Sequence, residues 1–248
     1  MKYLITNADD FGFTRDVNQG ILEAHRNGIL TATTLMATGA AFQHAVELAR
    51  ENPTLDVGVH LVLVGAEGFP ETVARLMGAI ALGRIRIYDR LASQVRQILD
   101  AGLRPTHLDT HKHTHLLPPV MDAVARIAEE FGIAWVRRPL DAPIPFLRTW
   151  LNSTLRRHGC RTTHHFAGFE MTGNYDARQL AALIRGLREG VTEFMCHPGL
   201  CTPELQAART RLKESRQREL EALKSPEVKA AVETARVALV RYCDLSTT

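Results

Sequence analysis

The chain has 248 residues, of which 45% are hydrophobic and 23% charged, and its formal net charge at pH 7 is +3. A chain of this length buries a sizeable core, and this composition is typical of a globular protein. The small net charge, carried by basic residues spread along the sequence, argues against a nucleic-acid partner.

Short apolar or β-branched runs alternate along the chain with amphipathic segments of helical period. The predicted strands are Tyr3–Asn7, Thr31–Met36, Asp56–Val64, the stretch beginning at His107, Ala134–Arg137, Thr162–Phe166, Val191–Cys196 and Val237–Arg241. The predicted helices are Val17–Arg26, Ala41–Arg50, a short one within Gly65–Gly83, Tyr88–Ala101, Pro118–Phe131, Trp150–His158, Ala177–Glu189, Pro203–Leu223 and Glu227–Thr234. Strands that alternate with helices about seven times predict a parallel sheet and an irregular (β/α) barrel.

Two segments depart from this alternation. Gly65–Gly83 is weakly patterned and is interpreted as a lid-like loop, while the prolines of Pro139–Pro145 require a loop. The charged C-terminal helices, with Arg and Glu at helical spacing, are interpreted as a solvent-facing pair that covers the barrel exterior. We therefore expect one domain over residues 1–248, with the helices at about 203–235 packed on the barrel.

No targeting or membrane-spanning segment is visible. The apolar run after Met1 is too short for a signal peptide, and no stretch approaches the roughly 20 apolar residues that cross a bilayer. The cysteines lack CxxC spacing and are interpreted as reduced thiols. They are Cys160, Cys196, Cys201 and Cys243. A cytoplasmic location is expected.

A run of histidines is the strongest chemical signal in the sequence. Four of the eleven histidines and one carboxylate stand at alternate positions between His107 and His115. If the whole stretch were a strand, the side chains of His107, Asp109, His111, His113 and His115 would line one face. Imidazole is the commonest ligand of borderline divalent metals, so we prefer a metal-centred active site to a solvated histidine-rich loop.

Other polar residues stand in predicted strands or just past their carboxyl ends. They are Asp9, Asp10, His60, Arg137, Arg138 and His197. In a parallel α/β barrel these ends form the face that carries the active site, so the residues converge on one mouth. Two adjacent carboxylates repel unless a cation neutralises one of them. A helix N-cap is the alternative role for one Asp, although Thr14 or Asp16 can fill it.

One Asp and two His form a suitable ligand set for a divalent ion that keeps open positions for water and substrate. The residues alone leave His107, His111 and His113 open as ligands. A free carboxylate would take a proton from the ion's water, and His197 would protonate a leaving group from the other side. This is the chemistry of amide or ester hydrolysis, and the spacing does not separate acyl from phosphoryl substrates.

The motifs resemble those of one family. Asn7-Ala-Asp-Asp-Phe-Gly12, Gly58-Val-His60, Thr106-His-Leu-Asp-Thr-His111-Lys-His113 and His197-Pro-Gly199 resemble the YdjC-like carbohydrate deacetylases, the family of chitooligosaccharide deacetylase. The resemblance covers nearly the full length. It implies a distorted (β/α) barrel of the polysaccharide-deacetylase type and removal of N-acetyl groups with one divalent ion, namely Zn²⁺, Mg²⁺, Co²⁺ or Mn²⁺.

The resemblance also implies roles for individual residues. Asp10, His60 and His111 would bind the metal, Asp9 would be the general base and His197 the general acid. Arg137 or Arg138 would orient the base. Asp109 would be an orienting carboxylate. His113 and His115 would contact the substrate or support the metal ligands from behind.

Within the family the chain looks closest to the hopanoid-biosynthesis branch, which implies an N-acetylglucosaminyl hopanoid as substrate. The resemblance includes Val136-Arg-Arg-Pro-Leu140. An apolar groove for such a lipid would lie in Gly65–Ile87 or Pro139–Trp150, although ordinary packing is the preferred interpretation of both. A lipid substrate would bring the chain to a membrane surface, and a homodimer is compatible with the family. The alternatives are a chitooligosaccharide deacetylase, a metal-dependent phosphoesterase and a non-catalytic sugar-binding protein.

Overall fold

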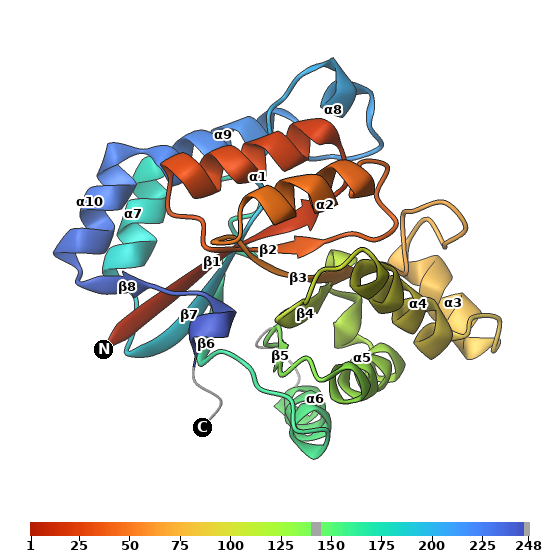
Figure 1. Ribbon diagram of the computed structural model, residues 1–248. Coiled ribbons are helices and arrows are strands. Elements are labelled where there is room, and N and C mark those ends of the chain that lie inside the picture. Colours follow the sequence, from red (N-terminus) through yellow and green to blue (C-terminus); the bar gives the residue numbers. More distant parts are fainter. Residues whose placement is uncertain (140–144, 246–248) are drawn as a thin grey trace.

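The structure is a computed structural model, which describes residues 1–139 and 145–245 (Figure 1). Its strands are β1 (Lys2–Phe11), β2 (Ala32–Leu35), β3 (Asp56–Leu61), β4 (His107–Thr110), β5 (Trp135–Val136), β6 (His165–Ala167), β7 (Gly190–Cys196) and β8 (Val237–Leu239). They form one parallel sheet in the order β5-β4-β3-β2-β1-β7-β6, with β8 paired to β1.

Strand β1 pairs with three other strands of the sheet. Its first half pairs with β8 and its second half with β2, while β7 runs along its other edge. The two ends of the sheet, β5 and β6, curl toward each other. This is shown by a parallel bridge between Trp135 of β5 and Arg161, just before β6. The expected distorted (β/α) barrel is therefore confirmed.

Helices cover the sheet. They are α1 (Arg15–Asn27), α2 (Phe42–Glu51), α3 (Val73–Ala81), α4 (Ile87–Asp100), α5 (Pro118–Phe131), α6 (Pro145–Arg157), α7 (Ala177–Arg185), α8 (Pro203–Ala207), α9 (Glu214–Lys224) and α10 (Pro226–Thr234). Helix α1 packs beside α2 and α9, α4 beside α5, and α7 beside α10 (Figure 1). Two 3₁₀ helices, η1 (His111–Leu116) and η2 (Tyr242–Asp244), complete the described elements.

Local chemistry explains the entry into α1. The hydroxyl of Thr14 accepts a hydrogen bond from the backbone N–H of Val17, which caps the helix. Thr14 thus fills the capping role that was the structural alternative for Asp9 or Asp10. The buried apolar face of α1, which includes Val17 and Ile21, packs into the main core.

The prediction of one extended histidine run is wrong. Strand β4 ends at Thr110, and the chain then turns into η1, where Lys112 and His113 both adopt left-handed backbone angles. Of the run, His107 and Asp109 therefore lie on a strand, and His111, His113 and His115 lie on a tight turn. Alternation of residue type predicts a shared face only while the backbone stays extended.

The interpretation of the C-terminal helices as a solvent-facing cover is correct only in part: exposed charged residues such as Arg218, Glu221 and Lys229 face solvent, but other charged residues do not. The segment predicted as one helix over Pro203–Leu223 is divided into α8 and α9. Helix α9 buries Arg216 and Glu219, each only 1% exposed. Arg and Glu at helical spacing suit a solvated face, and the sequence alone does not show that this face turns inward.

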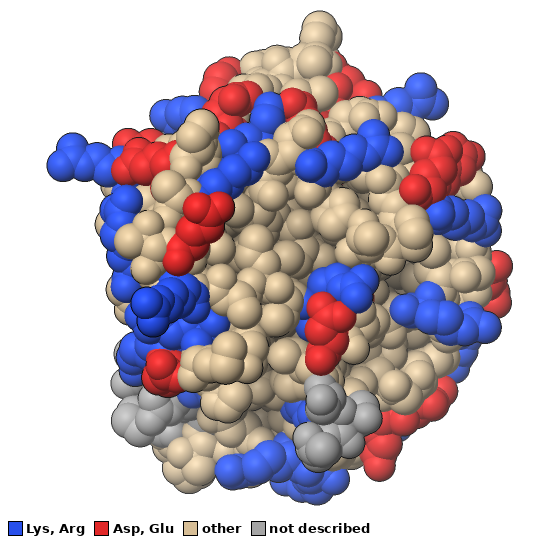
Figure 2. Space-filling model, turned by 60° about the vertical axis from the view of Figure 1, so that its left-hand side comes forward, with Lys and Arg blue, Asp and Glu red and all other residues tan. Residues whose placement is uncertain are grey.

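Several smaller expectations can be compared with the described residues. Most of the predicted loop Pro139–Pro145 lies outside them, and α6 begins at Pro145. The four cysteines are unpaired. Within residues 1–139 and 145–245, no helix combines the length and hydropathy needed to cross a membrane. On the face shown in Figure 2, Lys and Arg are interspersed with Asp and Glu.

Candidate metal centre and active site

The end of β1 places two carboxylates at the floor of a cavity of about 960 Å³. The strand continues through Asp9 and Asp10 to Phe11, with an irregularity in its pairing with β2 between Ala8 and Phe11. Asp10 has a left-handed backbone with φ of 69°. An L-residue in this region costs about 1–2 kcal/mol, and such strain is concentrated at functional sites.

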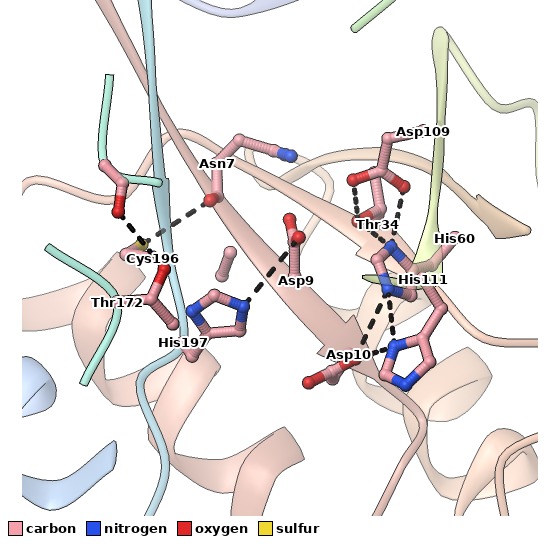
Figure 3. Close-up of polar contacts among 12 residues, drawn as sticks. Asn7, Asp9, Asp10, Thr34, His60, Asp109, His111, Thr172, Cys196 and His197 are labelled. Carbon is pink, nitrogen blue, oxygen red and sulfur yellow. Dashed lines mark hydrogen bonds and ion pairs between the residues drawn. The ribbon is translucent and has the colours of Figure 1, made fainter. Parts of the chain in front are cut away.

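Asp10, His60 and His111 come from the ends of β1, β3 and β4, and each directs one ligand atom at the others (Figure 3). Oδ1 of Asp10 lies 3.3 Å from Nε2 of His60 and 3.1 Å from Nδ1 of His111, and the two nitrogens are 3.2 Å apart. Ligands held about 2.0 Å from a tetrahedral ion are separated by about 3.3 Å. The donor set and its spacing therefore fit one divalent ion, with positions left open toward the cavity.

The other side of His60 is held by Asp109. Nδ1 of His60 lies 2.7 Å from Oδ1 of Asp109, whose Oδ2 accepts a hydrogen bond from the hydroxyl of Thr34. A carboxylate in this position fixes the imidazole tautomer and directs Nε2 at the metal. Burial lowers the pKa of His60, but the charge of Asp109 and hydrogen bonds to Asp10 and Asp109 raise it to about 10. A metal ion at Nε2 would bind the neutral imidazole and would therefore compete with this proton.

The three ligand residues Asp10, His60 and His111 are called the metal cradle below. Arg137 bonds to the carboxylates that lie behind it. Its NH1 and NH2 donate to the two oxygens of Asp9 at 2.8 and 2.6 Å, its NH1 also lies 2.6 Å from Asp109, and its Nε donates to Glu193 at 2.7 Å. Burial raises the pKa of Asp9, but the charge and hydrogen bonds of Arg137 outweigh it and hold that pKa well below its usual range. Asp9 is therefore a fixed, unprotonated carboxylate.

Arg138 takes no part in this network. It is half-buried, and no bond from it to Asp9, Asp109 or Glu193 occurs among the described residues. Of the two arginines that the sequence left open, Arg137 is the one that contacts Asp9. Glu193, buried on β7, was missed by the sequence analysis because an apolar strand gives no sign that one glutamate faces an arginine.

His197 faces Asp9 from the end of β7. Its Nε2 lies 3.9 Å from Oδ2 of Asp9 (Figure 3). Its backbone N–H donates to Glu219 of α9 at 2.6 Å. Burial lowers the pKa of His197, while the carboxylates of Glu219, Asp9 and Asp10 act in the opposite direction. The imidazole of His197 and the metal cradle lie on different sides of Asp9 (Figure 3).

Helix α9 also contributes Arg216, which the sequence analysis missed. Its NH2 donates to Oδ2 of Asp10, the oxygen that does not face His60 and His111. This bond leaves Oδ1 as the oxygen directed at the cradle. Arg216 and Glu219, one turn apart on α9, thus hold Asp10 and the backbone of His197, respectively.

The other three histidines of the run, His107, His113 and His115, do not belong to the metal-ligand trio. His107 lies behind the site, bonded to Thr106 and Asn7 and stacked on Tyr242 with ring centroids 4.0 Å apart. His115 is buried, 2.8 Å from the hydroxyl of Thr110, and is not among the cavity-lining residues. His113 does line the cavity. Desolvation lowers the pKa of His107 and of His115 to about 3.

A second trio of ligand-type groups, Asp9, His60 and Asp109, also lies close together. The guanidinium of Arg137 is bonded to both of these carboxylates, so it supplies the positive charge there. The first trio is the better candidate for a metal site, because Arg216 bonds to Oδ2 of Asp10 and leaves Oδ1 facing the two imidazoles.

These features define an α/β barrel protein with a candidate single-metal centre at the carboxyl ends of its strands. The chain belongs to the YdjC-like protein family, whose model matches residues 3–234. A carbohydrate deacetylase from Brevibacillus brevis is 34% identical over 98% of this chain and 99% of its own length. A chitooligosaccharide deacetylase from Klebsiella pneumoniae is 34% identical over the same shares.

Two solved structures have a similar fold. A crystal structure from Enterococcus faecalis, named for a proposed cleavage of cellobiose phosphate, has a TM-score of 0.84 and 27% identity over 99% of both chains. A family 4 carbohydrate esterase from Streptomyces lividans, solved with acetate, has a TM-score of 0.50 at 11% identity over 97% of this chain and 91% of its own. The second likeness concerns the fold alone.

Proposed function

We propose that this protein is a metal-dependent carbohydrate N-deacetylase, which hydrolyses the acetamide of an N-acetylglucosaminyl substrate to acetate and a free amine. The observation that supports it most is the cradle of Asp10, His60 and His111 beside the Arg137-bound carboxylate of Asp9. Relatives named carbohydrate deacetylase and chitooligosaccharide deacetylase, alignable over nearly the whole chain, support the same activity.

The side chains divide the work of hydrolysis. A divalent ion held by the cradle would polarise the acetyl carbonyl and acidify the attacking water. Asp9, fixed by Arg137, accepts the proton of that water as the new C–O bond forms. His197 delivers a proton to the sugar nitrogen as the C–N bond breaks, so that the amine leaves uncharged. Asp109 keeps His60 in the tautomer that directs Nε2 at the metal.

The group that carries the sugar is a finer proposal. We propose an N-acetylglucosaminyl hopanoid, on the resemblance to the hopanoid-biosynthesis branch, with a chitooligosaccharide as the alternative that the names of the relatives favour. Cavity-lining apolar side chains, among them Phe13, Val64 and Met195, are compatible with a lipid. Of the two stretches considered for a groove, Gly65 to Glu67 line the cavity, and Pro139–Trp150 includes residues outside the described part.

A lipid substrate would bring the protein to a membrane surface. On α3, Met77 is 53% exposed, and Leu82 at the helix end is 64% exposed. Exposed Arg75 and Arg84 stand near them in the sequence, and basic and apolar side chains together favour anionic interfaces. We also propose that the chain acts as one domain, because β1 and β8 from its two ends pair in one sheet.

Two other functions fit less well. Phosphoester hydrolysis often uses two metal ions, and here Arg137 already occupies the second trio of ligand groups. A non-catalytic sugar-binding protein has no use for Asp9 and His197, which would transfer protons on opposite sides of the scissile bond.

Acetate release tests the proposal. Purified protein is incubated with an N-acetylglucosaminyl hopanoid and separately with diacetylchitobiose, after metal removal and after addition of Zn²⁺, Co²⁺ or Mg²⁺. Metal-dependent acetate from the hopanoid alone supports the hopanoid assignment, and acetate from diacetylchitobiose supports the alternative. No acetate from either substrate, with metal bound, would contradict the proposed activity.

A further inference from the structure

The loop after β6 presents a half-exposed aromatic ring to the mouth of the cavity. Phe169 is 46% exposed and lines the cavity, although large apolar side chains are ordinarily withdrawn from water. Asp9 and Asp10, at the floor of the same cavity, are 3% and 4% exposed. The acetamide must reach the floor, so a ring at the mouth meets the part of the substrate that extends away from the reacting sugar.

The Phe169 ring is supported from behind by His113. The two ring centroids are 4.9 Å apart at an interplanar angle of 82°. His113 in turn lies against Phe166 at 6.0 Å and His115 at 5.5 Å. His113 is the aromatic contact of Phe169 among the described residues, and the 46% exposure of Phe169 leaves part of its ring uncovered for stacking.

The backbone near the rings of His113 and Phe169 adopts conformations that are strained or closely packed. Lys112 and His113 adopt consecutive left-handed conformations, which L-residues rarely take, and this turn sends His113 toward the cavity. On the other side, Gly168 has φ of +103°, and an added Cβ would come within 2.2 Å of the carbonyl oxygen of Met195. The loop is thus pressed against β7 at the residue before Phe169.

Hydrogen bonds hold the rest of the loop. The hydroxyl of Thr172 donates to the carbonyl of Phe169 at 2.9 Å, and the N–H of Gly173 donates to the carboxylate of Glu219 at 2.8 Å. The ring is therefore pre-positioned, which reduces the entropy lost when a ligand binds. Polar side chains of Glu170, Thr172 and Asn174 line the cavity beside it.

We propose that Phe169, supported by His113, is a stacking platform for a saturated ring attached to the reacting N-acetylglucosamine. An aromatic face pairs with the C–H face of such a ring, and neighbouring polar groups receive its hydroxyls. The ring is either the second pyranose of an oligosaccharide or the first fused ring of a polycyclic lipid. This inference deepens the proposed function and rests on it for the identity of the reacting sugar.

Binding to a non-hydrolysing parent separates this inference from the proposed activity. In an Asp9→Asn background, calorimetry gives the dissociation constants of N-acetylglucosamine, diacetylchitobiose and a detergent-solubilised N-acetylglucosaminyl hopanoid. Phe169→Ala is expected to weaken at least one of the two-ring ligands about tenfold, or about 1.4 kcal/mol, and to leave N-acetylglucosamine unchanged. Which ligand weakens identifies the source of the ring.

Phe169→Trp should retain the affinity, because it keeps an aromatic face. Leu239→Ala, which removes a 38% exposed apolar side chain on β8 that does not line the cavity, is the control and should change nothing. Equal losses for all three ligands, no loss for the two-ring ligands, or no binding of either to the parent would overturn the platform. Phe169-dependent binding without acetate release by the unmodified protein would keep the platform and reject the deacetylase.

Discussion

Arg137 and Asp9 form a two-pronged ion pair in which NH1 and NH2 meet the two carboxylate oxygens at 2.8 and 2.6 Å, with both side chains buried. A bidentate pair fixes the plane of the carboxylate as well as its charge. The same guanidinium reaches Asp109 and Glu193, so the base and the carboxylate behind His60 share one support.

Loss of Arg137 is expected to impair both stability and turnover. Arg137→Ala leaves three buried carboxylates without their cation, which should cost about 3–5 kcal/mol of unfolding free energy. In the folded fraction, kcat/KM should fall at least about 100-fold because Asp9 loses its orientation. Urea unfolding and acetate release check the two effects. Arg138→Ala is the matched control, and a similar loss in that variant would contradict the assignment to Arg137.

The two adjacent aspartates should fail in different ways. Asp9→Asn removes the proton acceptor and should abolish turnover while one metal ion per chain stays bound. Asp10→Asn weakens a ligand and should lower metal affinity as well as turnover. Metal content after dialysis, measured beside acetate release, distinguishes them. If Asp9→Asn lost the metal and Asp10→Asn retained it, Asp9 would be the metal ligand and Asp10 the proton acceptor, contrary to the assignment.

Asp109 should act through His60. Asp109→Asn removes the carboxylate that holds Nδ1 of His60, and comparable losses behind metal ligands weaken binding about 10–100-fold. Competition with a chromophoric chelator measures the change. Unaltered zinc affinity in this variant would show that His60 does not depend on Asp109.

Close packing at Gly58 should be intolerant of a side chain. A Cβ at this position would lie 2.5 Å from the carbonyl oxygen of His107 and 2.6 Å from its ring. Gly58→Ala is therefore expected to destabilise the protein by about 1–3 kcal/mol. Gly78→Ala is the matched control, because nothing lies within 4 Å of a Cβ there, and it should stabilise α3 by about 0.5–1 kcal/mol. Equal effects of the two substitutions would contradict the packing argument.

Acidification from pH 7 to pH 5 should destabilise the fold through His107. Burial lowers the pKa of His107 from 6.5 to about 3, so below pH 6.5 the unfolded chain binds a proton that the folded chain excludes. This contribution to stability is complete above pH 6.5 and is lost as the pH falls toward 3. Between pH 7 and 5 the loss is about 2 kcal/mol. The unfolding free energy of His107→Gln should depend less steeply on pH over this range, and an unchanged slope would exclude the effect.

Much of the fold could be predicted because local pattern and long-range structure agree in it. Helix α5 covers the predicted residues Pro118–Phe131, and most strands appear where apolar runs predict them. Asp9, Asp10 and His60 could be proposed as neighbours because parallel strand ends meet at one edge of a sheet.

Other parts depend on interactions that no local pattern carries. The alternation in the histidine run predicts a strand, but Lys112 and His113 adopt left-handed backbone angles that end it, so His113 and His115 do not continue the face that carries His111. Arg216, Glu219 and Glu193 lie among residue patterns that predict solvated helices or an apolar strand. Their roles follow from partners more than 20 residues away in sequence, namely Asp10, the backbone of His197, and Arg137.

The most direct test of the account is a metal titration of turnover. Metal-free protein receives increasing Zn²⁺ or Co²⁺ while acetate release from diacetylchitobiose and from the N-acetylglucosaminyl hopanoid is followed. We predict that activity toward at least one of them rises in proportion to added metal and reaches its plateau at one ion per chain. A plateau at two ions per chain, or full activity in the metal-free protein, would contradict a single-metal site built by Asp10, His60 and His111.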